Sequence, residues 1–571
     1  MKTKITTNRL LAGLSFVLCL LLPATGLVSC ADMMETDSEL LEFEKDNTLG
    51  NPEDTIFSVM GILQKIQAIA DRSVLLGEVR GDLTVVTDDA TPDLKRLAAF
   101  QNGQANKYNA ISDYYAVINN CNYFIAHADT ALRRRGRQVF LSEYAAVKTY
   151  RAWAYLELAK AYGSVPFTLS PMMTEDEARA VQDGPRADLA TICNTLIDDI
   201  SPYVDTDLPD YGSVGSQSSE KLFIPTRVML GDLCLWAGRY REAAQWYHDY
   251  LADKDKPVTM YTGAATWYSS QFNSVNRSGY NPASSTEVIC SLPMESNAFS
   301  GVMSEIGDIF NSTKQNNYYA SATPSAALRT LSAAQDYCMI NATGTTIDTL
   351  YAPKTGLNDA LATGDLRLYA SYSLNSVARD RYSEYSSDVQ TIRKLSTSSV
   401  TFVRRAMVYL RYAEALNRAR LPQSAFAVLK YGLYPQNVTT YVDAQERADA
   451  GDLIYFDAAT FTSYNTLGIH SRGCGDCRAD TLYALPLPPT ALATRQDTID
   501  YQVPLVEDMI LDEMALEGMF EGNRFYDLMR VALRRGDTSY LANAVARRTG
   551  TTDASLQSLL LDSSNWYLKI E

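Results

Sequence analysis

Residues 513–530 read EMALEGMFEGNRFYDLMR and place Glu513, Glu517 and Glu521 at intervals of four. On a helix, side chains four residues apart lie above one another, so these three carboxylates are expected on one face. A row of carboxylates is typical of two arrangements. One is acid/base machinery, and the other is a set of ion pairs that holds a helix in place.

Arg524 and Asp527 continue the same row and favour the second arrangement. A half-buried charge needs a partner of opposite sign, and the fold loses several kcal/mol when that partner is removed. We therefore predict a structural ion network that contains Glu517, Glu521, Arg524 and Asp527. Its members are expected to pair with one another or with neighbouring helices.

The composition excludes some classes of partner. The chain has 571 residues and a formal net charge of −16, which argues against nucleic acid as a partner. Tyrosine is abundant at 36 residues, against 17 phenylalanines and 5 tryptophans. Some of these tyrosines must reach the surface, where an amphipathic ring is a good contact for polar ligands such as sugars.

The N-terminus predicts export and lipid anchoring. Lys2, Lys4 and Arg9 precede the apolar run Leu10–Pro23, which is too short to span a bilayer and is typical of a signal peptide. Residues 27–30, LVSC, resemble a bacterial lipobox, in which Cys30 is acylated after residues 1–29 are removed. Residues 30–50 are polar and acidic and are expected to form a tether at the cell surface.

Cys474 and Cys477 form a C-x-x-C motif in residues 473–477. Because an exported protein folds in an oxidising compartment, we expect a local disulfide between them. Two alternatives stay open, which are unpaired thiols and a metal or redox site that also uses His470. The second C-x-x-C of a zinc site is missing, so no metal is predicted.

Pairs of helices dominate the rest of the chain. Residues 142–167, 226–251 and 402–433 carry apolar stripes at three- and four-residue spacing, and the last two contain small residues at a tight turn, as in tetratricopeptide (TPR) repeats. The blocks do not recur at a fixed period, so we predict a mostly α-helical scaffold of irregular TPR-like pairs. Loop-rich insertions with a few short strands are expected at about 255–400 and 435–500.

These motifs together resemble the SusD/RagB family. The C-terminal signature of that family matches at Glu513, Glu517, Phe520, Glu521, Gly522, Arg524, Phe525, Tyr526, Asp527, Leu528 and Arg530. This chain departs from it at residues 514–516, where bases are usual, and at Val531, where tryptophan is frequent. Residues 150–167 and 409–419 resemble two other family helices, and Asp365-Leu366-Arg367 resembles its Asp-Pro-Arg loop with leucine for proline.

The resemblance implies a function and an architecture. It implies an α-superhelix over residues 51–571, with an N-terminal TPR-like half at about 51–255 and the signature at about 505–537. It implies a lipoprotein on the outer face of the outer membrane that binds oligosaccharides, needs no cofactor and delivers them to a SusC-like TonB-dependent transporter. The alternatives are a peptide-binding, RagB-like member and an adaptor that binds only protein.

Ligand contacts are expected in loops that mix aromatic and polar side chains. The segments that reach the ligand in the family point to Arg80 and Asp82, Tyr318 and Tyr319, and, behind them, Trp267 and Tyr268. For each of these residues a purely structural role is the alternative. An enzyme is not predicted, because G-x-S-x-G, H-E-x-x-H and compact His/Asp clusters are all missing from the sequence.

Overall fold

The computed structural model describes residues 52–214, 217–260, 266–267, 275–276, 280–295, 301–311, 320–343, 346–352, 364–375, 389–395 and 399–570. All of them belong to one compact unit that spans Gly50–Glu571. Cys30 and the predicted signal peptide and tether lie outside the described residues. Among the helices that are described, none is long and apolar enough to cross a bilayer.

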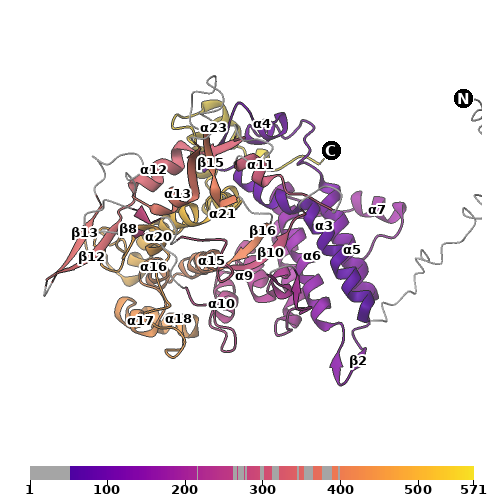
Figure 1. Cartoon of the computed structure of the whole chain (residues 1–571), viewed down its shortest axis with the longest axis horizontal. Helices are drawn as coiled ribbons and strands as arrows, with labels where there is room; N and C mark the ends of the chain where they lie inside the picture. The colour runs from indigo at the N-terminus through magenta and orange to yellow at the C-terminus, as the bar shows by residue number, and fades with distance from the viewer. Residues whose placement is uncertain are drawn as a thin grey trace, which may run out of the picture. The chain divides into compact units, whose positions relative to one another are not determined.

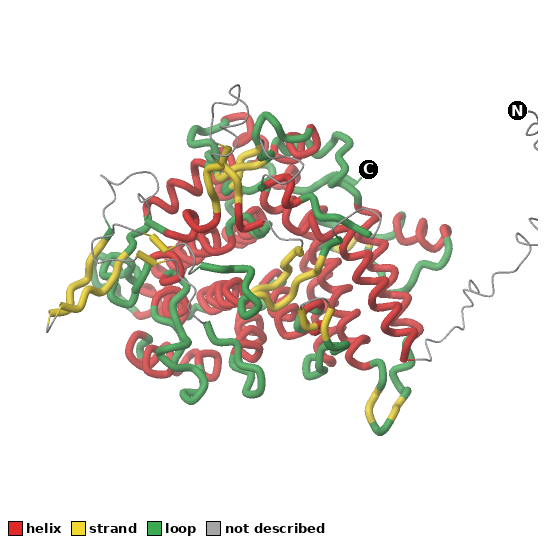
Figure 2. Tube along the Cα trace, in the orientation of Figure 1, coloured by secondary structure: helices red, strands yellow, loops and turns green. Residues whose placement is uncertain are grey.

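Helices form most of the described chain, as predicted (Figures 1 and 2). The N-terminal helices are α3 (Pro52–Glu78), α4 (Pro92–Ala98), α5 (Ile111–His127), α6 (Leu141–Tyr162), α7 (Glu175–Gln182), α8 (Leu189–Ile200), α9 (Thr226–Trp236) and α10 (Tyr240–Leu251). The middle of the chain contains α11 (Ile306–Phe310), α12 (Ala326–Ala334) and α13 (Leu366–Ser371). The C-terminal helices are α15 (Arg405–Arg418), α16 (Pro422–Lys430), α17 (Pro435–Tyr441), α18 (Ala444–Ala450), α19 (Ser471–Cys474), α20 (Arg495–Gly518), α21 (Arg524–Arg535), α22 (Thr538–Ala546) and α23 (Ala554–Leu560).

The strands are short and form antiparallel pairs instead of one large sheet (Figure 2). The pairs are β1 (Thr84–Val86) with β11 (Ala322–Pro324), β2 (Arg133–Arg134) with β3 (Arg137–Gln138), β4 (Val165–Pro166) with β5 (Arg186–Ala187), β6 (Ser213–Val214) with β7 (Gln217–Ser218), β8 (Thr266–Trp267) with β9 (Val275–Asn276), β10 (Val288–Pro293) with β16 (Ser399–Arg404), β12 (Cys338–Thr343) with β13 (Thr346–Tyr351), and β14 (Tyr372–Asn375) with β15 (Val389–Ile392). Short 3₁₀ helices are η1 (Ser201–Tyr203), η2 (Ser219–Leu222), η3 (Arg393–Leu395), η4 (Gly451–Ile454) and η5 (Ser563–Trp566).

The predicted helix pairs are present. Helices α9 and α10 pack against each other, as do α15 and α16, and α10 also packs on α15. Gly231 explains the close approach within the first pair, because a Cβ at that position would lie 2.4 Å from the ring of Tyr247. Helix α6 ends at Tyr162, and Gly163 follows with a positive φ of 76°.

Residues 513–530 do not form one helix, in contrast to the prediction. Helix α20 ends at Gly518 and α21 begins at Arg524, with Phe520 and Gly522 at positive φ angles of 69° and 83°. A Cβ on Gly522 would lie 2.4 Å from the Ser73 carbonyl oxygen, so only glycine lets this linker pass against α3. The periodicity of the carboxylates continues across a turn that the glycine makes possible.

Candidate functional site

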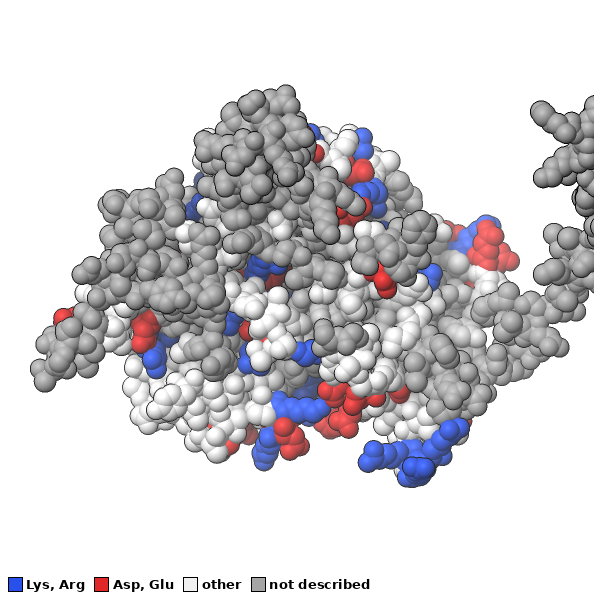
Figure 3. Space-filling model, in the orientation of Figure 1, with Lys and Arg blue, Asp and Glu red and all other residues white. Residues whose placement is uncertain are grey.

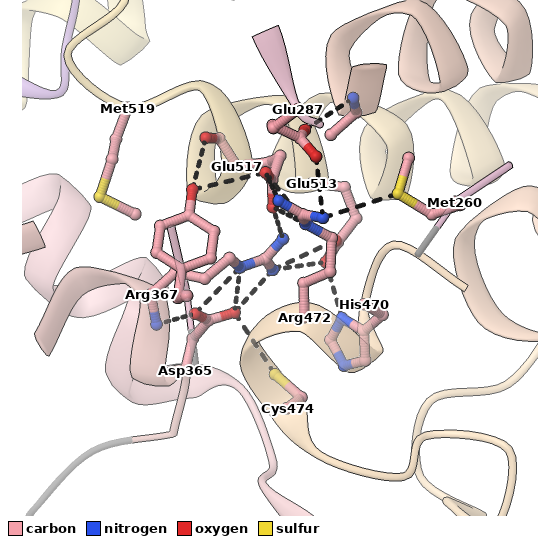
Figure 4. Close-up of polar contacts among 12 residues, drawn as sticks. Met260, Glu287, Asp365, Arg367, His470, Arg472, Cys474, Glu513, Glu517 and Met519 are labelled. Carbon is pink, nitrogen blue, oxygen red and sulfur yellow. Dashed lines mark hydrogen bonds and ion pairs between the residues drawn. The ribbon is translucent and has the colours of Figure 1, made fainter. Parts of the chain in front are cut away.

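Glu513 and Glu517 lie in a buried ion network at the end of α20 (Figure 4). Glu517 is fully buried. Its carboxylate accepts hydrogen bonds from Arg367 Nη1 at 3.0 Å, Arg404 Nη1 at 2.7 Å and Arg472 Nε at 3.2 Å. Three guanidinium groups from three different segments therefore meet at one carboxylate.

Glu513 and Asp365 hold Arg367 from the other side. Arg367 Nη2 lies 3.1 Å from Glu513 Oε2 and 2.6 Å from Asp365 Oδ2. The second oxygen of Glu513 lies 2.6 Å from His470 Nδ1. Asp365 also caps α13, since its side chain accepts from the Arg367 backbone N–H at 2.8 Å. Leu366 is the first residue of that helix, a position where proline is also favoured, so the leucine changes little in this loop.

The network extends to the strand pair β10–β16. Arg404, at the end of β16, donates to Glu287 Oε1 at 3.0 Å and to Glu521 Oε2 at 2.7 Å. Arg472 lies 3.4 Å from Glu287 Oε2, and Lys394 forms an ion pair with Glu521. Segments more than 200 residues apart are thus joined at one end of α20.

The electrostatics of the network exclude acid/base work. Burial alone would raise the pKa of Glu517, but Arg472, Arg404 and Arg367 outweigh burial and hold the pKa well below its usual value. The pKa of Glu513 is lowered in the same way by Arg367 and His470, against its burial. Both groups are permanently ionised at neutral pH and closed to solvent, so they have neither a proton to give nor access to a substrate.

Arg524 has a different partner from those its sequence position suggests. It forms a bidentate pair with Asp82, with 2.7 Å from Nε to Oδ1 and 3.0 Å from Nη2 to Oδ2. Asp527 pairs with Arg530 at 2.8 Å. Within the described chain, Arg524 does not pair with Glu517, Glu521 or Asp527, because the turn at residues 519–523 directs α21 away from α20. All four predicted members are ion-paired, and Glu517, Arg524 and Asp527 are buried whereas Glu521 is partly buried. Glu517 and Glu521 share Arg404, while Arg524 and Asp527 belong to two other pairs.

Arg80 and Asp82 were expected to contact ligand, and the structure favours structural roles for both. Arg80 is fully buried and donates to the Trp566 carbonyl oxygen at 2.7 Å and to Tyr526 Oη at 3.0 Å. Its guanidinium also lies 4.3 Å from the centre of the Phe525 ring. Asp82 is occupied by Arg524. A ligand could reach neither side chain without breaking these contacts.

The predicted disulfide is not formed. Cys474 and Cys477 are both buried free thiols, and their sulfurs donate to different groups. Cys474 Sγ lies 3.4 Å from Asp365 Oδ2, and Cys477 Sγ lies 3.1 Å from the Lys430 carbonyl oxygen. Burial raises the pKa of Cys477 to about 12. Of the alternatives left open by the sequence, the structure matches unpaired thiols.

Two of the segments predicted to carry ligand contacts meet through a strand pair. Strand β1 follows directly on Arg80–Asp82 and pairs with β11, which begins just after Tyr318 and Tyr319. Helix α11 precedes those tyrosines, and it is fixed by Glu305, whose carboxylate lies 2.7 Å from Lys107 Nζ and 3.0 Å from Tyr108 Oη. The described parts of these segments therefore form the base of a candidate ligand site.

The aromatic residues predicted at this site are not all described. Tyr268, Tyr318 and Tyr319 lie outside the described residues. Trp267 lies in β8, of which only the backbone is described, paired with β9. The chain that carries Tyr318 and Tyr319 is fixed at one side by Thr87, whose hydroxyl donates to the Ala320 carbonyl oxygen at 2.7 Å.

A cavity of about 360 Å³ was not indicated by the sequence. It lies beside η2, α9 and β10, and its lining includes Tyr250, Lys221, Arg227 and Arg405. Arg227 is paired with Asp253 at 2.9 Å, whereas Lys221 donates to a carbonyl oxygen and has a pKa lowered by burial and by Arg405. This volume is at the lower end of the range of small-molecule sites, and its lining suits a small polar ligand.

Known proteins are similar to this chain in part of its sequence and in fold. Residues 380–558 match the model of the SusD family. The solved structures with the same fold include a SusD superfamily protein from Bacteroides thetaiotaomicron VPI-5482, with 18% identity, a TM-score of 0.51, and 92% of this chain and 95% of that chain covered. Another is a SusD superfamily protein from Bacteroides vulgatus ATCC 8482, with 12% identity, a TM-score of 0.55, and 91% and 95% coverage.

A third similar structure is described as a SusD-like carbohydrate binding protein from Bacteroides vulgatus ATCC 8482. It is 16% identical, with a TM-score of 0.51 and 84% of each chain covered. A comparison with curated protein sequences gave no match. The resemblance to the SusD/RagB family and the predicted mostly helical fold are thus confirmed, by sequence over residues 380–558 and by fold over most of the chain.

Several central residues of the ion network were not predicted. Arg404 and Arg472 lie outside residues 513–530, and Glu287 directly precedes strand β10. In the sequence, each of these three residues is a charged residue next to an apolar strand or helix. This pattern is so frequent in proteins that it does not identify a buried ion network. Apart from the glutamates of the signature, only Asp365 and Arg367 stood in a motif that the sequence revealed.

Proposed function

We propose that this chain is a non-catalytic binding protein for oligosaccharides, anchored on the cell surface by lipid on Cys30. It would deliver its ligand to a SusC-like TonB-dependent transporter in the outer membrane. The observation that carries the proposal is the SusD family match at residues 380–558, together with a SusD-type fold. A similar structure that is described as carbohydrate binding supports sugar as the ligand class.

The geometry of the described residues supports binding over catalysis. The most conspicuous carboxylates, Glu513 and Glu517, are buried and neutralised by arginines. The pairing of β1 with β11 and the contact of Lys107 with Glu305 instead join segments that meet only in the folded chain. Aromatic rings on a protein surface can stack on the apolar faces of sugars, while polar groups bind the hydroxyls.

We place the ligand at Tyr318 and Tyr319, with Trp267 and Tyr268 as neighbours. Isothermal titration calorimetry across a panel of soluble glycans would identify the ligand, and Tyr318→Ala and Tyr319→Ala would test the site. Each substitution is expected to weaken binding about tenfold, because a stacked ring contributes on the order of 1–2 kcal/mol. Tyr464→Ala is the matched control, since Tyr464 is 88% exposed on a different segment.

Unchanged affinity in both tyrosine variants would contradict this site. Lys221→Gln would then show whether the cavity beside η2 takes the ligand instead. A protein that binds no glycan, but binds peptides or co-purifies with another protein, would support the peptide-binding or adaptor alternatives.

A further inference from the structure

The hairpin β2–β3 presents four arginines to solvent. Arg133, Arg134, Arg135 and Arg137 lie within five residues of chain, and all four are exposed. The hairpin projects from the molecule between α5 and α6 (Figure 1), and a basic group lies at the same place in the space-filling view (Figure 3). It is a concentrated positive charge on a chain whose formal net charge is −16.

None of these four arginines forms an ion pair or hydrogen bond with a carboxylate of the described residues. The nearest acidic residue in sequence, Asp129, accepts instead from the backbone N–H groups of Ala131 and Leu132 at 2.9 and 3.2 Å. Elsewhere on the surface, arginines such as Arg179 and Arg495 do have carboxylate partners. The charge of the hairpin is therefore available to a partner outside this chain.

One of the four arginines, Arg135, lies in a strained backbone conformation. Arg134 pairs with Arg137 across a two-residue loop, in which Arg135 and Gly136 have positive φ angles of 51° and 83°. Glycine and asparagine are preferred at both positions of such a loop, and another residue at positive φ costs about 1 kcal/mol. Arg135 occupies the first position, where it adds charge at the expense of backbone strain.

The hairpin lies at the end of the helix pair α3–α5 at which α3 begins. Arg72 of α3 donates to the Ala110 carbonyl oxygen at 3.0 Å and pairs with Asp113, so the end of α3 meets the start of α5. Because the two helices pack side by side, they are antiparallel, and the first turns of α3 lie near the end of α5 (Figure 1). The hairpin follows the end of α5, and Pro52 begins α3, so both are at the same end of this helix pair.

We propose that hairpin β2–β3 is a docking surface for anionic, phosphate-bearing lipid headgroups. It would hold the folded unit against the membrane surface beside the lipid on Cys30. This inference rests on the proposed lipid anchor, but not on the identity of the glycan. A guanidinium group is well suited to phosphate because its planar N–H donors can bind two oxygens at once.

The acidic tether is the competing occupant within this chain. Residues 31–46 contain seven carboxylates and one lysine, so their charge is complementary to that of the hairpin. We favour the membrane because the proposed anchor on Cys30 would keep the hairpin beside a continuous anionic surface. Arginines near such a surface gain about fivefold in affinity each, so four of them give several hundredfold.

The test uses the mature chain with Cys30→Ser, which cannot be acylated. Its binding would be measured by co-sedimentation with vesicles of phosphatidylglycerol and phosphatidylcholine, and with vesicles of phosphatidylcholine alone. We expect binding only to the anionic vesicles, and release as salt shortens the screening length. The variant with Arg133, Arg134, Arg135 and Arg137 all changed to glutamine is expected to lose this binding several hundredfold.

A matched control carries the same loss of four charges elsewhere. It changes Arg179, Arg420, Arg478 and Arg495 to glutamine, all partly exposed and paired with carboxylates. The control is expected to bind anionic vesicles like the parent chain. Equal binding by the hairpin variant, or no binding by the parent at low salt, would overturn the proposal. Binding that appears only after residues 31–50 are deleted would also overturn it, because the tether would then be the occupant.

One substitution separates charge from folding. Arg135→Gly relieves the positive φ and is expected to keep or raise the melting temperature while it weakens vesicle binding about fivefold. A stabilised variant with unchanged vesicle binding would remove Arg135 from the docking surface. Glycan affinity and mass-spectrometric acylation of the wild-type chain are measured separately, so failure of the proposed function or of the anchor would be distinguishable from failure of the docking surface.

Discussion

Gly77 of α3 and Gly522 of the α20–α21 linker meet backbone to backbone. A Cβ on Gly77 would lie 1.6 Å from the Gly522 carbonyl oxygen. The contact is fixed further by Glu78, whose carboxylate oxygen accepts from the Gly522 N–H at 3.2 Å. The family signature is therefore joined to the first described helix of the chain by two residues that cannot carry side chains.

Gly77→Ala is expected to lower the free energy of unfolding by about 3 kcal/mol, because the added methyl group forces two backbones apart. Urea denaturation followed by circular dichroism would measure the loss. Gly61→Ala on the same helix is the control, since nothing lies within 4 Å of a Cβ there and φ is not positive. The control should gain up to about 1 kcal/mol from helix propensity. Equal stability of the two variants would show that the close contact is absent in solution.

Glu517→Gln is expected to destabilise the fold by about 3–5 kcal/mol. Three arginines surround this carboxylate, and its loss leaves their buried charge uncompensated. Thermal denaturation would measure the effect. Glu175→Gln is the control, because the pair of Glu175 with Arg179 is exposed and contributes little. A loss of glycan binding in Glu517→Gln without a loss of stability would contradict the structural role.

The class of fold could be predicted from the sequence, because helical periodicity and the glycine and proline positions are local signals. The residues of the C-terminal signature were identified correctly, but their partners were not. Arg524 pairs with Asp82, 442 residues away in sequence, and no local pattern encodes such a distance. The single helix expected over 513–530 was wrong because charge spacing continues through the Gly522 turn.

The candidate site was less predictable than the fold. Arg80 and Asp82 have the composition of a ligand loop, an arginine and an aspartate around a glycine, yet both side chains point into the core. Composition does not tell which way a side chain faces at the end of a helix. The cavity beside η2 was not predicted, because its lining residue Tyr250 belongs to helix α10 and the sequence of that helix has the periodicity of a structural helix.

Arg524→Ala and Asp82→Asn are expected to lower the melting temperature by similar amounts while leaving glycan affinity unchanged. Each change leaves one charge of the buried pair without its partner, at a cost of about 3–5 kcal/mol. Differential scanning calorimetry and titration of the folded fraction would measure both quantities. Normal stability with lost binding in Asp82→Asn would restore Asp82 as a ligand contact.

The thiols provide a test of the region around α19. The seven described cysteines are free and buried, including Cys474 and Cys477. Because burial raises their pKa values, they are protonated at neutral pH and closed to reagents. In the mature chain with Cys30→Ser, which carries only these seven of the nine cysteines, we expect none to react with Ellman's reagent in the native state and all seven to react in guanidinium chloride. A yield of five in the denatured chain would indicate that the disulfide forms after all.

Glu78 predicts a decline of stability as pH rises from about 4 to about 8. Burial raises its pKa to about 8, against the opposing hydrogen bonds from the Gly522 and Phe520 N–H groups. In the unfolded chain the pKa is about 4.3. The folded state therefore binds the extra proton between these values, and its contribution to stability is lost as pH rises towards 8.

Glu78→Gln should remove this dependence, because glutamine accepts from Gly522 and does not ionise. Urea denaturation at a series of pH values from about 5 to 9 would show a smaller decline for the variant than for the parent chain, by at most about 4 kcal/mol. Glu513 and Glu517 act in the opposite direction, since their lowered pKa values remove stability only as pH falls below about 4. Parallel curves for parent and variant above pH 5 would mean that Glu78 is already ionised in the folded chain.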